Sequence, residues 1–241
     1  MKQAFRLSAI LFSISILTVT ALAENTTYRL DNLGISIELP SEIYVLTRDI
    51  KSDQPGLELT GMTAEEYVKS LEDTNTYLEA LGEDWGIMSI VMNDIGNGNI
   101  NELNELEIQQ VISGIEASGT TETQCYKHDV YQHKQEKFLR FFWHETQSPT
   151  DQDTRYILQY YTVCDGKAIN IYFDFTRGEI DENKEAMARL VIDSIIFYDT
   201  HDAGTLNANN MQFISIAIYF SAFGIILLLF LAVKRSWKRQ S

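Results

Sequence analysis

Histidine and cysteine supply many of the metal ligands and nucleophiles in proteins, and this 241-residue chain contains 4 histidines and 2 cysteines. His128 and His133 are five positions apart in a segment expected to be extended. Strand alternation therefore points them to opposite faces, and they do not form a simple ligand pair. His144 is followed by Glu145 in another expected strand and lacks the second histidine of a zincin helix.

Two further polar segments lack a complete metal-binding pattern. In the run from Asp94 to Asn99, the third and fifth positions of a calcium-binding loop are glycines. His201 and Asp202 lie in a polar stretch that we interpret as a linker, where a solvated pair is expected. The sequence therefore predicts no metal site and no cofactor.

Motifs of nucleophilic catalysis are not found either. The chain has no Gly-x-Ser-x-Gly elbow and no phosphate-binding glycine loop. Carboxylates are so frequent that no acid–base pair stands out. Asp49 and Asp53 beside Arg48 could border a groove, but a surface loop is the expectation. We assign no catalytic or cofactor-binding residue and expect a protein that is not an enzyme.

Cys125 and Cys164 invite a disulfide if the chain is exported. The expected strand pairing argues against one. A hairpin turning at Lys134 brings Cys125 level with residue 157, whereas Cys164 lies about 20 Å farther along the sheet at roughly 3.3 Å per residue. We expect the two cysteines not to be bridged.

Two apolar stretches bracket the chain. At the front, Lys2 and Arg6 precede an apolar run that ends in Ala21-Leu22-Ala23, the pattern of a cleaved signal peptide over residues 1–23. The alternative is an uncleaved anchor, but the run of about a dozen residues is shorter than the roughly 20 that span a bilayer.

Near the other end, residues 212–233 predict a transmembrane helix, because Phe213 to Val233 contains no charged residue. The tail 234–241 is basic and includes Trp237, as expected on the cytoplasmic side. Residues 199–211 form the expected linker, and the bulk of the chain lies outside the cytoplasm in a single-pass type I arrangement.

Charge is distributed unevenly along the chain. All 34 acidic residues but only 13 of the 19 basic residues fall in 24–211, so this segment has a net charge of −21. Nucleic acids gain their affinity for proteins by pairing phosphate with lysine and arginine, so a nucleic-acid partner is excluded. A solvated acidic surface, a basic protein partner and loosely held divalent cations remain as alternatives.

Residues 24–198 are expected to form one α+β domain. Thr63 and Glu66 match a capping box at the start of a helix. Leu71 and Leu78 follow at helical spacing and Gly82 can end the helix, so one helix is expected up to that glycine. The expected elements are a hairpin over 28–39, a strand over 44–47, a polar loop over 49–61, a helix over 63–82, a strand over 86–93, a helix over 102–117, an antiparallel meander over 123–176 and a helix over 181–195.

The Asp165-Gly166 pair predicts a two-residue type I′ turn. This turn sets a register in which Thr162 faces Ile169 and Tyr160 faces Ile171, leaving one side of the ribbon apolar. The opposite side is expected to be wetter or covered by a polar helix face; it carries Gln159, Tyr161, Asn170 and Asp174.

Three framework segments, Leu33–Pro40, Tyr44–Asp49 and Asp193–Phe197, resemble a group of uncharacterised bacterial exported proteins. That group is similar in layout to the PsbP/Mog1-like sandwich, an antiparallel sheet with helices packed on it. The resemblance covers roughly residues 28–198 and implies a binding or assembly factor, without any functional residue that is carried over.

The leading functional hypothesis is a membrane-anchored extracytoplasmic binding or assembly module with a protein partner. A cell-surface sensor for a small ligand is the alternative, with Tyr156, Tyr160, Tyr161 and Tyr172 as stacking surface, although core tyrosines are the simpler interpretation. A hydrolase with an unrecognised site is the third.

Overall fold

The computed structural model describes residues 25–82, 86–96, 98–120, 122–146, 154–175 and 178–198. The expected signal peptide, linker, transmembrane helix and tail lie outside these residues, as do His201 and Asp202. Within the described ranges, no helix is long and apolar enough to cross a membrane.

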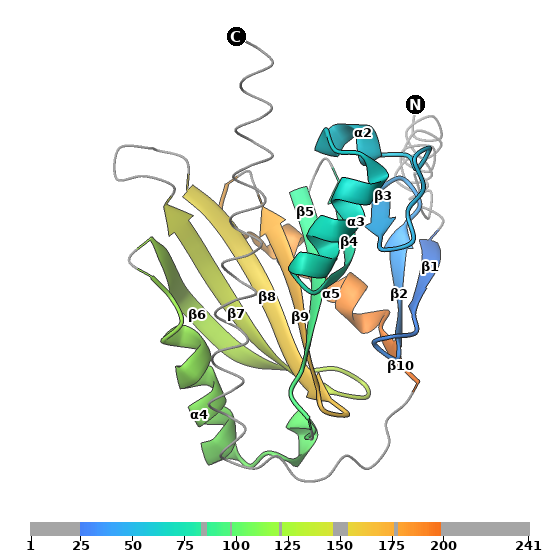
Figure 1. The fold of residues 1–241 in the computed structure, drawn as a ribbon. Helices are drawn as coiled ribbons and strands as arrows, with labels where there is room; N and C mark the ends of the chain where they lie inside the picture. The colour runs from blue at the N-terminus through green and yellow to red at the C-terminus, as the bar shows by residue number, and fades with distance from the viewer. Residues whose placement is uncertain are drawn as a thin grey trace, which may run out of the picture.

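Two antiparallel sheets organise the described residues (Figure 1). The strands are β1 (Asn25–Leu30), β2 (Ile35–Pro40), β3 (Tyr44–Thr47), β4 (Thr76–Gly82), β5 (Gly86–Asp94), β6 (Thr123–Gln132), β7 (Lys137–Thr146), β8 (Thr154–Cys164), β9 (Lys167–Phe175) and β10 (Ile196–Phe197). The large sheet has the order β3-β4-β5-β9-β8-β7-β6, and the small sheet has the order β1-β2-β10.

The helices lie on both faces of the large sheet. They are α2 (Leu57–Thr60), α3 (Ala64–Asp73), α4 (Glu105–Glu116) and α5 (Glu182–Asp193), with a 3-10 turn η1 (Ile100–Glu102). Strand register assigns the faces: Leu46, Glu79, Ser89, Tyr172, Gln159 and Phe141 are successive partners across six strands and therefore share one face. Leu46 packs with α3, and Phe141 packs with α4.

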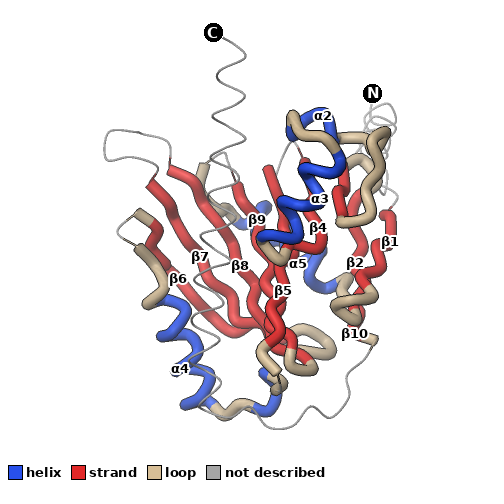
Figure 2. The backbone as a smooth tube through the Cα atoms, in the orientation of Figure 1, coloured by secondary structure: helices blue, strands red, loops and turns tan. Residues whose placement is uncertain are grey.

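The opposite face of the large sheet carries the main core. Leu78, Ile90 and Tyr160 pack there against Ile37 of the small sheet and Val191 of α5. Figures 1 and 2 show α3 and α4 in front of the large sheet, with α5 behind it. The expected α+β fold with an antiparallel sheet and packed helices is therefore observed.

The register of the meander agrees with the sequence prediction. Thr162 pairs with Ile169 and Tyr160 with Ile171. Asp165 and Gly166 have φ values of 51° and 71°, the positive values that a type I′ turn requires. A β-branched residue or alanine at the glycine position would strain this turn, which explains why the sequence signal was strong.

The predicted helix over 63–82 is wrong in its second half. The capping box of Thr63 and Glu66 is present, but α3 ends at Asp73. Asn75 then adopts a positive φ of 52° and redirects the chain into strand β4. Leu78 consequently faces the main core, whereas Leu71 packs on the other side of the sheet with α3. The seven-residue spacing of these leucines fits a helix, and no local signal outweighed it.

The expectation of a wet or polar-covered side of the meander is also wrong. Gln159 and Asn170 are 2% and 0% exposed. They are linked by hydrogen bonds instead: Trp143 Nε1 donates to Gln159 Oε1 at 2.8 Å, and Gln159 Nε2 donates to Asn170 Oδ1 at 2.7 Å, while Asn170 Nδ2 is buried without a partner. Tyr161 is buried in the cluster beneath the apolar side of α4.

The short strand β10 has a side chain as its second neighbour. One edge of β10 pairs with β2 through Ile196 and Phe197. On the other edge, the Gln135 side-chain amide binds the Phe197 backbone. Gln135 Nε2 donates to the Phe197 carbonyl at 3.1 Å, and Gln135 Oε1 accepts from the Phe197 N–H at 3.1 Å. The turn between β6 and β7 thereby holds the C-terminal end of the domain.

Candidate metal centre

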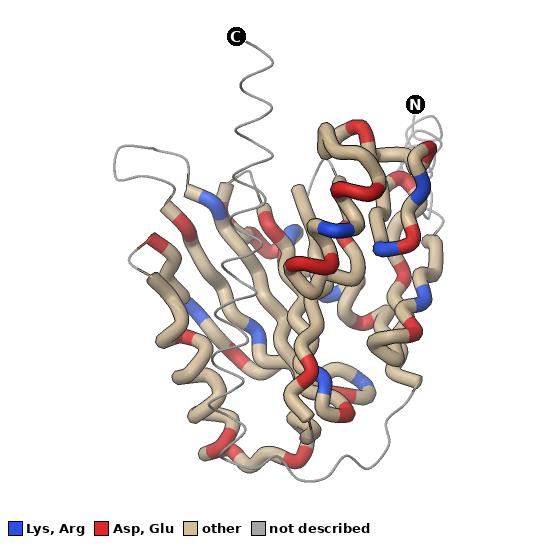
Figure 3. Tube along the Cα trace, in the orientation of Figure 1, with Lys and Arg blue, Asp and Glu red and all other residues tan. Residues whose placement is uncertain are grey.

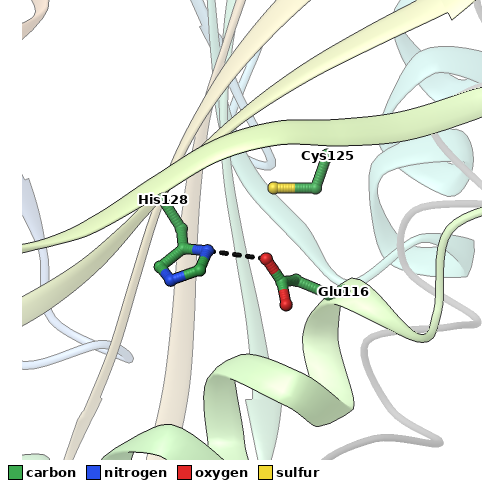
Figure 4. A group of neighbouring side chains, drawn as sticks. All are labelled: Glu116, Cys125 and His128. Atoms are coloured by element: carbon green, nitrogen blue, oxygen red, sulfur yellow. Dashed lines mark hydrogen bonds and ion pairs between the residues drawn. The ribbon is translucent and has the colours of Figure 1, made fainter.

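Glu116, Cys125 and His128 converge between the end of α4 and the outer strand β6. Their carboxylate, sulfur and imidazole ligand atoms all lie within 4.8 Å of one another. Glu116 Oε1 and His128 Nδ1 are 2.6 Å apart. Figure 4 shows the Cys125 thiol pointing toward this pair.

A β-bulge in β6 brings the two β6 residues to the same side. Cys125 pairs with Trp143, but Lys127 pairs with the next residue of β7, Phe142, so Tyr126 has no partner of its own. Residues three apart in a regular strand face opposite sides. The extra residue reverses that alternation, so Cys125 and His128 both lie on the face that carries α4.

Helix α4 supplies the third side chain. Its start is a capping box in which the Asn104 side chain accepts from Glu107 N and the Glu107 carboxylate accepts from Asn104 N. Ile108, Val111, Ile112 and Ile115 bury the stripe that faces the sheet. This packing fixes the helix, and therefore its last residue Glu116, above the edge strand.

The connection from α4 to β6 is short and tight. A Cβ added to Gly119 would lie 2.8 Å from the carbonyl oxygen of Thr123, closer than a real side chain allows. The absence of a side chain lets the chain reverse directly after the helix. Glu116 is consequently held near the start of β6, where Cys125 lies.

The electrostatics of the site favour a cation. The C-terminal end of a helix has a partial negative charge, and the last turn of α4 contains no basic residue. Lys127 does not neutralise Glu116, because its ammonium lies over the Phe142 ring at 4.3 Å, on the other face of the sheet. The close partner of the Glu116 carboxylate is the His128 imidazole.

The thiol is not prepared for nucleophilic attack. Burial raises the pKa of Cys125, and the Glu116 carboxylate raises it further. The Cys125 sulfur lies 3.3 Å from the Lys127 carbonyl oxygen, to which the thiol donates. A nucleophilic cysteine requires an environment that stabilises the thiolate, which this site does not provide. The combination of a sulfur, an imidazole nitrogen and a carboxylate oxygen is a donor set for a transition metal.

Of the described residues, His133 and His144 are separate from this site. The His133 ring contacts Phe138 and Phe197, and burial lowers its pKa. As predicted from the sequence, His133 and His128 do not form a pair. His144 stacks on Tyr126 with ring centroids 5.8 Å apart, away from the cluster.

The polar loops considered from the sequence have structural roles. Arg48 Nε donates to the Thr76 carbonyl at 2.7 Å, and its guanidinium lies over the Tyr77 ring. The Asp94 carboxylate accepts from Gly96 N at 2.9 Å, which closes a turn. Asp49 and Asp53 are exposed.

The two cysteines are free thiols, as the register predicted. Cys125 lies level with Trp143 and then Ile157, whereas Cys164 is at the far end of β8. Cys164 donates to Glu136 Oε1, and burial together with this carboxylate raises its pKa to about 12.

The tyrosines proposed as a stacking surface are mostly core residues. Tyr160 and Tyr161 are fully buried and Tyr172 is 8% exposed. Tyr156 is partly accessible and meets Tyr126 edge to face at 6.4 Å. The accessible aromatic group is therefore Tyr126, His144 and Tyr156, which the sequence did not indicate.

The convergence of Glu116, Cys125 and His128 was not anticipated from the sequence. Cys125 and His128 were each considered, but never as a pair, because a bulge cannot be recognised from alternation alone. The available signal was the acidic end of a predicted helix only a few residues before a cysteine and a histidine.

Comparison with known proteins shows structural likeness without sequence kinship. No protein-family model matches the chain, and no curated protein matches it. The chain is structurally similar to the solution structure of cyanobacterial PsbP (CyanoP) from Synechocystis sp. PCC 6803, with 13% identity and a TM-score of 0.44 over 73% of this chain and 94% of that one.

Two further solved structures are similar at lower scores. The Saccharomyces cerevisiae Ran-binding protein Mog1p has 11% identity and a TM-score of 0.38 over 74% of this chain and 97% of its own. A Pseudomonas aeruginosa protein of unknown function, PA94, a putative regulator, has 7% identity and a TM-score of 0.34 over 72% and 96%.

Proposed function

We propose that this protein is a membrane-anchored extracytoplasmic binding module that holds a basic protein partner close to the bilayer. The apolar run at 212–233, with its basic tail, supports the anchor, and the run at 1–23 supports export. A linker of about a dozen residues has a flexible reach of only about 20 Å, which keeps the domain near the membrane.

One observation carries the choice of partner. Between Lys69 and Lys127 the chain contains eleven Asp and Glu residues and no Lys or Arg. Six of these acidic residues are exposed in the structure, and we call them the acidic face: Glu72, Asp73, Asp94, Glu102, Glu105 and Glu122. No ion pair between described residues involves any of them.

Four residues of the acidic face, Glu72 and Asp73 of α3, Glu102 of η1 and Glu105 of α4, belong to elements that pack on one side of the large sheet. In Figure 3, α4 and the turn before it show acidic positions and no basic ones. Leu106 lies among these carboxylates on α4 and is 69% exposed. An apolar contact surrounded by like charges suits a basic protein surface, which offers both complementarity and burial.

A comparison of two neutralised variants in the full-length chain tests this function. The first removes four charges of the acidic face through Glu72→Gln, Asp73→Asn, Glu102→Gln and Glu105→Gln. The matched control removes four exposed charges elsewhere through Glu38→Gln, Glu42→Gln, Asp49→Asn and Asp53→Asn. Each protein is cross-linked in intact envelopes, and the cross-linked residues are mapped by mass spectrometry.

We expect one cross-linked partner with a basic surface, joined through α3 or α4. It should be lost from the first variant, retained by the control and weakened by added salt. A cross-link that both variants retain equally, or that maps to the small sheet, would contradict the proposal. So would recovery of nothing beyond what the transmembrane segment alone captures.

A second candidate, a small-ligand sensor, is favoured by the accessible aromatic group of Tyr126, His144 and Tyr156. Tyr126 is 47% exposed and already stacks on His144. Thermal stabilisation by a sugar or metabolite that Tyr126→Ala abolishes would support a sensor. A hydrolase is a weaker candidate, because the cysteine beside a histidine has a raised pKa.

A further inference from the structure

We propose that Glu116, Cys125 and His128 bind a transition-metal ion of the Zn²⁺ class, with water completing the coordination. The proposal does not depend on the membrane anchor or on the protein partner. It depends on the convergence of three different donor atoms, a sulfur, a nitrogen and a carboxylate oxygen, within 4.8 Å of one another.

The separations are close to those of a metal site. Tetrahedral Zn²⁺ bonds of about 2.0–2.3 Å place ligand atoms roughly 3.2–3.8 Å apart. Glu116 Oε1 and His128 Nδ1, at 2.6 Å, would move slightly apart to accept the ion. Both side chains are 37% exposed, so these rotations meet little packing resistance and the ion has a path from solvent.

The donor set selects the class of metal. A thiolate and an imidazole favour Zn²⁺, Co²⁺ and similar ions, whereas Ca²⁺ and Mg²⁺ require mostly oxygen ligands. Binding breaks the Cys125 S–H bond and releases one proton to solvent. The divalent charge is then balanced by one thiolate and one carboxylate, with a neutral imidazole.

The surroundings resemble the supporting shell of a metal site. Cys125 lies opposite Trp143 and His128 opposite Phe141, so aromatic rings form an apolar floor on the sheet. The C-terminal end of α4 adds a partial negative charge. An open coordination position would face solvent, as in zinc sites that keep a water ligand.

The competing interpretation is an ordinary surface pair between His128 and Glu116 in which Cys125 has no part. The two interpretations differ in whether the Cys125 sulfur binds a metal ion. Co²⁺ reports this directly, because a thiolate bound to Co²⁺ gives a sulfur-to-metal charge-transfer band in the near ultraviolet.

The test is a titration of the detergent-solubilised full-length chain with Co²⁺, in excess Mg²⁺ to saturate the weak carboxylate sites of this acidic protein. A Cys164→Ser background leaves Cys125 as the sole thiol. We expect a charge-transfer band that saturates at one Co²⁺ per chain and disappears when Zn²⁺ is added.

Variants then assign the ligands. Cys125→Ser, with Cys164 intact, should lack the band, and His128→Ala and Glu116→Gln should each weaken binding by about tenfold or more. Glu105→Gln, on the same helix, and His144→Gln, in the neighbouring strand, should bind as the parent does. A band that persists in Cys125→Ser, or equal losses in ligand and control variants, would overturn the proposal.

A second measurement needs no substitution at the site, in case a ligand variant fails to fold. In the Cys164→Ser protein, Zn²⁺ should slow alkylation of Cys125 by iodoacetamide, and removal of Zn²⁺ with a chelator should restore the rate. An alkylation rate that is unchanged by Zn²⁺, together with no charge-transfer band, would refute metal binding here.

Discussion

At the scale of single residues, the Arg155 guanidinium on β8 is a largely buried charge. It lies between two carboxylates, 3.2 Å from Glu145 Oε2 and in an ion pair with Asp174. All three side chains are largely buried, and burial raises the pKa of Glu145 even with the cation beside it. Each group therefore depends on the others to compensate its desolvation.

Removing Arg155 should leave two uncompensated acids inside the protein. We expect Arg155→Gln to lower the free energy of unfolding by about 3–5 kcal/mol. The matched control is Arg29→Gln, which breaks the pair of Arg29 with Asp31 on the surface and should change stability by about 1 kcal/mol or less. Urea unfolding followed by circular dichroism measures both, and equal losses in the two variants would contradict the prediction.

Glu136 gives the free energy of unfolding a pH dependence opposite to that of a carboxylate whose pKa is lowered in the folded state. It is 1% exposed, and burial raises its pKa above the ordinary value of 4.5. Its contribution to stability is therefore complete below about pH 4.5 and is lost as pH rises through the folded-state pKa.

We expect Glu136→Gln to gain stability relative to wild type as pH rises above about 4.5, because the amide has no charge to bury. Below that pH the two proteins should converge. Unfolding midpoints across a pH series measure the difference, and other titrating groups cancel because they are common to both proteins. A difference that does not vary with pH would show that Glu136 titrates normally.

At the scale of elements, strand β10 depends on a side chain from elsewhere in the chain. Gln135 makes two hydrogen bonds with the Phe197 backbone, where a third strand would otherwise pair. Replacing it leaves the N–H and the C=O of the buried Phe197 with no protein partner, and each such group costs up to about 1–3 kcal/mol when water cannot reach it.

We therefore expect Gln135→Ala to free β10 selectively. Amide exchange at Phe197 should accelerate strongly, while exchange in β8 and β9 should follow only the smaller global loss of stability. Lys134→Ala, the neighbouring exposed position, is the control. Uniform acceleration across all strands would mean that β10 and the core open together.

Elements whose signals were local were predictable from the sequence, and those decided by one irregular residue were not. The Asp165-Gly166 turn determined the β8–β9 register, and the Thr63 capping box marked the start of α3. Asn75, whose positive φ separates α3 from β4, cannot be recognised from the hydrophobic periodicity of the sequence. The bulge at Tyr126, which brings Cys125 and His128 to the same face, likewise adds one residue without changing composition.

At the scale of the whole molecule, the pattern of apolar residues predicts the arrangement of the layers but not which polar side chains are buried. Alternation in β8 and β9 correctly predicted which side carries the core. It could not predict that the opposite side would bury Gln159 and Asn170, because their burial depends on mutual hydrogen bonds across strands.

The proposed topology predicts a specific protease pattern. Protease added outside intact cells or protoplasts should remove the acidic domain and leave a small membrane-bound fragment that contains residues 212–241. The fragment should be recognised by a C-terminal epitope tag, and a cytoplasmic protein should stay intact in the same sample. Full-length chain in the soluble fraction, or protection of the domain until the membrane is lysed, would contradict the type I arrangement.

The two-residue strand β10 also determines how the fold would respond to mechanical load. Any pull on the chain beyond residue 198 acts first on Tyr198, whose N–H donates to the Gly34 carbonyl at 2.8 Å, and then on Phe197, which is held by β2 on one side and by Gln135 on the other. Ile196 and Phe197 would detach before the long meander strands bear tension, because so few bonds share the force. Tension applied at this end of the domain would therefore release β10 and the C-terminal end of α5 and leave the large sheet intact.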